Sequence, residues 1–100
     1  MASPQFGVAI GLFDAVYGSV VHDNTLVGLA SFGLGVGSQS ADDIAESNQF
    51  LGNNLTSLAA SVADVYLDTN SRHTLVAGKC RSYVDLGQGD RITCGMRVRP

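Results

Sequence analysis

The most specific chemistry in this sequence of 100 residues belongs to its two cysteines, Cys80 and Cys94. A zinc site needs more ligands than these two thiolates, and the only imidazoles, at His22 and His73, do not stand at zinc-ligand spacing from a cysteine. The cysteines are also too far apart for a Cys-x-x-Cys redox pair. We therefore predict a Cys80–Cys94 disulfide, no metal and no cofactor.

The sequence offers little for catalysis. A nucleophilic site needs a serine or cysteine beside a histidine and an orienting acid, and no local motif provides one near His22 or His73. Carboxylates are paired at 42–43 and at Asp64 and Asp68, but helix ends and a solvated surface explain these pairs without a glycosidase. We expect no enzyme active site.

A glycine-rich segment, Gly33-Leu34-Gly35-Val36-Gly37, stands before a predicted helix, as a phosphate-binding loop would. The P-loop lysine is missing, and the third glycine of a dinucleotide fingerprint falls at Ser40. Asp42 and Asp43 would also repel a phosphate at the same helix end. A glycine-rich strand end or turn is the favoured interpretation.

The cysteines must be positioned by the elements that carry them. Residues 74–86 and 91–99 read as two strands joined by Gly87-Gln88-Gly89-Asp90, which predicts a C-terminal β-hairpin with Cys80 and Cys94 equidistant from Gly87. In the second strand apolar residues alternate with a basic face formed by Arg91, Arg97 and Arg99. The hairpin places the two cysteines across from each other.

A long amphipathic helix is predicted from about Ala41 to Leu67. Ser40 and Asp43 resemble a capping box, and acidic residues favour a helix N-terminus. Gly52 and the two asparagines after it are poor helix formers, so the helix is either kinked or broken there. Its apolar face repeats at steps of seven, four and three: Ile44, Leu51, Leu55, Leu58, Val62 and Val65.

The apolar run 6–21 fits two periods. At helical spacing Phe6, Ile10, Phe13, Tyr17 and Val21 share one face, whereas its valines, glycines and aromatics favour two strands, 6–13 and 15–21. We favour the strands, the second joined to 26–34 through the turn 22–25. The run, which includes Asp14, is too short to span a bilayer, so ordinary core and a membrane-active interfacial segment both stay open.

These elements predict a single domain, residues 1–100, of the α+β class. An antiparallel sheet that includes the C-terminal hairpin is covered on one face by the long helix. The content of 45% hydrophobic and 15% charged residues is typical of a folded globular chain.

Charge is distributed unevenly along the sequence. No Lys or Arg precedes Arg72, and seven carboxylates lie before that point. The acidic and basic parts either pair with each other or leave the basic hairpin to face an acidic surface. A net charge of -3 argues against nucleic acid as the main partner.

Several features indicate a secreted protein whose leader has been removed, with Met1 added to a mature fragment. The first residues carry no secretory signal, but the chain has a spaced cysteine pair and a single lysine. The sequon Asn54-Leu55-Thr56 is compatible with secretion.

The fragment size, the secreted-type composition, Cys80 with Cys94, and the amphipathic segments 6–21 and 41–67 together resemble the virus-encoded killer toxins of the zygocin type that some yeasts secrete. The resemblance is in form, and no signature residue is carried over. It implies an antifungal toxin that binds a cell-wall glycoprotein and permeabilises the plasma membrane of sensitive yeast.

Two alternatives stay open: a non-lytic secreted binding or effector protein, and a structural subunit that self-assembles through glycine-rich strands. An exposed apolar patch would favour the toxin, a polar concave groove the binding protein, and a long open sheet edge self-association.

Overall fold

The computed structural model describes residues 8–38 and 42–94. Within these residues the chain forms strands and contains no helix. The strands are β1 (Val8–Phe13), β2 (Val20–His22), β3 (Thr25–Gly37), β4 (Ala45–Glu46), β5 (Gln49–Leu67), β6 (Ser71–Arg72), β7 (Leu75–Lys79), β8 (Tyr83–Asp85) and β9 (Arg91–Cys94).

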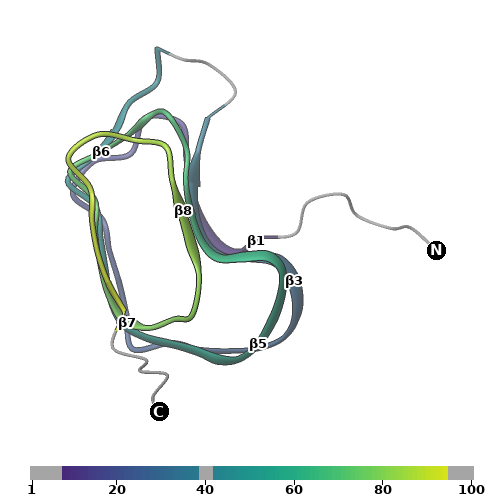
Figure 1. Cartoon of the computed structure of the whole chain (residues 1–100). Coiled ribbons are helices and arrows are strands. Elements are labelled where there is room, and N and C mark those ends of the chain that lie inside the picture. Colours follow the sequence, from purple (N-terminus) through teal and green to yellow (C-terminus); the bar gives the residue numbers. More distant parts are fainter. Residues whose placement is uncertain (1–7, 39–41, 95–100) are drawn as a thin grey trace.

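Every strand pair is parallel, and the chain winds into stacked coils that form a parallel β-helix. One side of the stack follows the order β1-β3-β5-β8, and another follows β2-β5-β7-β9. We number the coils 1 (residues 8–31), 2 (32–62), 3 (63–82) and 4 (83–94). Figure 1 looks along the stack, so the coils overlie one another.

The core fills the inside of the coils with side chains from successive turns. Leu34 of coil 2 pairs in register with Val65 of coil 3, and both are buried. The largest of the fully buried side chains is Phe50, which packs with the same cluster. Each coil thus buries its apolar residues against the coil above and below, which is how a repeat architecture obtains a continuous core.

The predicted antiparallel sheet is wrong, and so is the predicted α+β class. A tight turn was expected to reverse the chain at 22–25 and at 87–90. Instead β2 pairs with β5, and β3 pairs with β1 and β5. Each turn is one corner of a coil, so the next strand starts a different side of the stack and meets its partners one coil away.

The predicted helix over 41–67 is also wrong, because most of this segment is β5. Bulges explain why the apolar residues of this strand have a helix-like spacing. Two register shifts interrupt the pairing between β3 and β5, so buried side chains such as Leu55 and Leu58 are three residues apart and not two. Of the predicted apolar face, Val65 is also buried, Ile44 and Leu51 are half-buried, and Val62 is exposed. The expected capping residue, Ser40, lies outside the described residues.

The strand interpretation of the N-terminal run is confirmed for residues 8–13, which form β1, but is mostly wrong for the second predicted strand, 15–21. Residues 14–19 form a corner, and β2 includes only Val20 and Val21 of that segment before it ends at His22. Ile10 and Val21 pack against the core, whereas Phe13 and Tyr17 are exposed. Phe6 lies outside the described residues.

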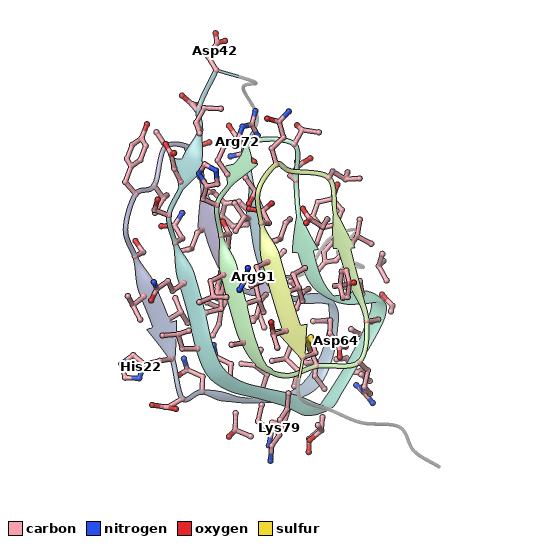
Figure 2. All side chains as sticks on the ribbon, turned by 60° about the vertical axis from the view of Figure 1, so that its left-hand side comes forward. His22, Asp42, Asp64, Arg72, Lys79 and Arg91 are labelled. Carbon is pink, nitrogen blue, oxygen red and sulfur yellow. A yellow bond between two sulfur atoms is a disulfide. The ribbon has the colours of Figure 1, made fainter. Side chains whose placement is uncertain are left out.

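The predicted disulfide is confirmed, but not in a hairpin. Cys80 and Cys94 are bonded, with their Cα atoms 5.1 Å apart. β7 and β9 run parallel, and Gly78 is in register with Cys94, so the bond ties coil 3 to coil 4. The alternation expected for 91–94 is present, with Arg91 exposed (Figure 2), while Arg97 and Arg99 lie outside the described residues.

One corner of the coil repeats the same backbone geometry in every turn. Gly18, Ser47, His73 and Gly89 follow the paired residues 17, 46, 72 and 88, and all four have positive φ, between 55° and 70°. This left-handed residue turns the chain into the next strand. The spacing between equivalent positions falls from 29 residues, Ser19 to Asn48, to 16, Thr74 to Asp90.

Buried polar side chains hold this corner together between coils. The Asn48 Oδ1 accepts a hydrogen bond from the Ser19 N–H at 2.9 Å, and its Nδ2 donates to the Val16 carbonyl at 3.0 Å. Asp90 occupies the equivalent position of coil 4, where its Oδ1 accepts from the Thr74 N–H at 2.7 Å. Its Oδ2 is buried without a hydrogen-bond partner among the described residues.

We expect Asp90→Asn to stabilise the protein at neutral pH. An asparagine amide can donate to the Ser71 carbonyl, the counterpart of the Val16 carbonyl that Asn48 uses, and one such bond contributes about 1 kcal/mol. Burial raises the pKa of Asp90, and the neighbouring Asp85 raises it further, although the bonds from Thr74 and Ser71 oppose both. The pKa of Asp90 is therefore higher in the folded than in the unfolded protein. The stability that this shift contributes to the wild type is complete below the unfolded-state pKa and is lost as the pH rises through the folded-state pKa.

Urea unfolding between pH 4 and pH 8 checks this expectation. The stability gain of Asp90→Asn should shrink as the pH falls towards 4. The reciprocal change, Asn48→Asp, should cost stability at pH 7 and recover part of it in acid. A gain from Asp90→Asn that is the same at every pH contradicts the assignment.

Coils 1 and 2 are wider than the coils that follow. Residues 25–31 of β3 and 54–62 of β5 bend outward together, and we call this two-stranded extension the lobe (Figure 1). Coil 3 bypasses it, because the chain passes from Lys79, beside Asn54, to Tyr83, beside Val65. Gly33 lies at the bend, where a Cβ would come within 2.6 Å of the Leu55 side chain.

Candidate functional site

A groove runs along the outside of the stack, on the side formed by β1, β3 and β5. It has a volume of about 1030 Å³ and opens to solvent. Its floor is the segment Gly35-Val36-Gly37, in which Val36 points into the core. A Cβ at Gly35 would lie 3.1 Å from the Val8 side chain, so glycine keeps this part of the floor clear.

Aromatic side chains line the groove. Phe13 lies over Gly37, in register with it, and 53% of it is exposed to solvent. Phe32 and Tyr66 meet with their ring centroids 4.8 Å apart and their planes tilted by 39°. These rings come from three successive coils, and Phe13 is the exposed one, whereas Phe32 is buried and Tyr66 is half-buried.

Polar groups gather at the end of the groove next to the corner. The Asp14 N–H donates to the Gly37 carbonyl at 2.8 Å, and the Ser38 hydroxyl donates to the Asp14 carboxylate at 3.3 Å. The Asp68 N–H donates to the Val36 carbonyl at 2.9 Å, one coil further along. Two carboxylates therefore stand at the same end, and none of the described residues that line the groove is a cation.

Tyr66 connects the aromatic and acidic parts of the groove. Burial raises the pKa of its phenol, and the nearby Asp68 raises it further through its negative charge and a hydrogen bond. The phenol is therefore neutral over the whole physiological pH range, and it donates its hydrogen bond to Asp68. The carboxylate oxygens at this end can accept hydrogen bonds from a ligand rich in hydroxyl groups.

Only part of the groove could be predicted from the sequence. Phe13 and Asp14, predicted to be membrane-active, lie in it, and so does Asp68, for which the sequence predicts only a helix end or a solvated surface. Phe32 and Tyr66 were missed, because a strand register and not a sequence motif brings them together. The signal that could have found the floor is the glycine alternation of 33–37, whose predicted strand end is confirmed.

The remaining candidate residues do not gather at one site. His22 lies 2.8 Å from the Asp23 carboxylate, while His73 lies 3.4 Å from Glu46 at another corner. Across residues 8–38 and 42–94, no three His, Cys, Asp or Glu side chains are placed to hold a metal ion. The space inside the coils between Phe50, Leu55 and Val76 is too small for a water molecule.

No protein-family model, curated protein or solved structure matches this chain. In the described part of the chain no helix is long and apolar enough to cross a membrane. The groove therefore has to be interpreted from its own chemistry.

Proposed function

We propose that this protein is a secreted, non-lytic binding module whose groove holds a neutral polysaccharide chain at a cell surface. The observation that carries the proposal is the combination in one open groove of an exposed aromatic ring, that of Phe13, a glycine floor and two carboxylates. A disulfide between coils is compatible with an oxidising, extracellular setting.

Each part of the groove matches a part of a sugar chain. The C–H faces of pyranose rings are apolar and pack against aromatic faces such as that of Phe13, while their hydroxyl groups donate to carboxylates such as Asp14 and Asp68. Asp14 and Asp68, with no cation among the lining residues in 8–38 and 42–94, disfavour uronate or sulfated chains, because like charges repel.

Binding can be measured by affinity electrophoresis and calorimetry with soluble polysaccharides. Neutral chains such as laminarin, yeast mannan and hydroxyethyl cellulose form one set, and polygalacturonate and alginate form the acidic set. We expect retention by at least one neutral chain and none by the acidic chains. Retention by no neutral chain contradicts the proposal, and release of shortened oligosaccharides contradicts the prediction that the protein is not an enzyme.

Phe13→Ala should weaken binding about tenfold, which corresponds to a loss of about 1.4 kcal/mol of stacking free energy. Tyr83→Ala is the matched control, because Tyr83 is 57% exposed on the same side of the stack but does not line the groove. Its affinity should equal that of the wild type. Equal losses in both variants would show that the groove is not the site.

A second candidate is the membrane-permeabilising killer toxin that the resemblance implied, with a cell-wall glycoprotein as its receptor. The observation that favours it is the exposure of apolar side chains on the lobe, namely Val27, Leu29 and Val62. Dye release from liposomes, measured beside killing of a yeast panel, separates the two functions. The binding module leaves liposomes intact, and the toxin makes them leak.

A further inference from the structure

The lobe has two edges, and they differ. Within the described residues, the lobe sheet consists of β3 and β5 alone, although three or more strands are usually needed for an independently stable sheet. The edge on β5 is covered at two carbonyl groups: the Arg81 guanidinium donates to the Leu58 carbonyl and, at 3.4 Å, to the Leu55 carbonyl. The edge on β3, residues 25–30, faces away from β5 and has no strand beside it in the described chain.

This edge has register irregularities at Thr25–Val27 and Ala30–Phe32, but no charge or proline protects it. Natural proteins protect such edges with charged residues or proline, and the segment Thr25-Leu-Val-Gly-Leu-Ala30 contains neither. Its outward side chains are apolar, with Val27 exposed to 69% and Leu29 to 88%. Across from them on β5, Ser57 and Ala59 add no charge.

We propose that a second copy of this chain pairs with residues 25–30, edge to edge, to form a dimer. A two-fold axis near Gly28 sets the two segments antiparallel and brings Leu29 of each copy beside Val27 of the other. The four strands then form one sheet across both lobes. Each chain has a net charge of -3, but the edge itself is uncharged, so no like charges meet at the contact.

We expect the assembly to stop at a dimer because the β3 edge and the β5 edge of the lobe differ. Head-to-tail pairing would need the β5 edge of the lobe, and there the guanidinium of Arg81 already occupies two carbonyl groups. The dimer therefore uses the edge on β3 twice and is closed by its two-fold axis. This inference is independent of the groove, which is lined by other residues.

Sedimentation velocity of the full chain over a range of concentrations tests the proposal. We expect a species of twice the 10.4 kDa chain mass at high concentration. Leu29→Lys should raise the dimer dissociation constant by about tenfold or more, since the substitution places a charge on each side of the contact. Val62→Lys is the control: it also places a lysine at an exposed lobe position, but on β5, and should leave the dimer intact.

Amide hydrogen exchange supplies a second readout in the same samples. Residues 25–30 should exchange slowly in the dimer and quickly in Leu29→Lys, with the rest of the protein unchanged. A wild-type protein that stays monomeric at all concentrations overturns the proposal. So does a dimer that survives Leu29→Lys or leaves the 25–30 amides unprotected.

Discussion

Leu58→Asp is expected to unfold the protein, whereas Val62→Asp should leave its stability nearly unchanged. Leu58 is 3% exposed and packs in the core beneath the bend of the lobe, so an ionised carboxylate there has no water to solvate it. The expected loss is at least about 3 kcal/mol, a large part of the stability of a small domain.

The pair of variants is diagnostic because a helix would bury both positions. Leu58 and Val62 are four residues apart and would share one helical face, but in β5 Val62 is 59% exposed. Exposed substitutions of this kind change stability by about 0.5 kcal/mol or less. Thermal and urea unfolding of both variants, checked by circular dichroism, provide the measurement. Equal destabilisation by the two substitutions contradicts the strand assignment of β5.

Removing the guanidinium of Arg81 is expected to have the second large effect. Asp64 is 2% exposed, and its Oδ2 accepts the Arg81 N–H at 2.7 Å and lies 3.4 Å from the Arg81 Nε (Figure 2 labels Asp64). Arg81→Ala leaves this buried carboxylate without its counter-charge and also uncovers the lobe edge on β5. The side chain of Arg81 is 42% exposed, so solvent screening reduces the loss to about 2 kcal/mol.

A double-mutant cycle separates the ion pair from the rest of the effect. Asp64→Asn removes the charge and keeps an oxygen that can accept the Arg81 N–H, so Arg81→Ala should cost less in that background. Arg91→Ala removes an exposed arginine of β9 and serves as the matched control, with little expected change. If Arg81→Ala lowers the free energy of unfolding in urea no more than Arg91→Ala does, the ion pair between Arg81 and the buried Asp64 does not stabilise the fold.

The sequence pattern and the structure differ most at β5. The steps of seven, four and three along 44–65 are those of an amphipathic helix, and nothing local contradicts them except Gly52, Asn53 and Asn54. In the structure Asn53 is buried, with its Nδ2 donating to the Val21 carbonyl and its Oδ1 accepting from Asn24. Residues that are poor helix formers therefore marked a corner between coils, and the neighbouring coil supplies the partners that make this corner stable.

The sequence by itself determined which residues are apolar, which segments tend to form strands, and which cysteines pair. Valines and aromatics favour strands in 6–21 for local steric reasons, and two cysteines allow one intramolecular bond. Only the tertiary structure decided strand direction, the stacking of coils and the groove. Parallel pairing joins residues about one coil apart, such as Gly35 and Tyr66, and the register that brings them together depends on corner lengths that vary from coil to coil. Because no fixed period repeats along the chain, this register is set by burial of the shared core and leaves no local pattern in the sequence.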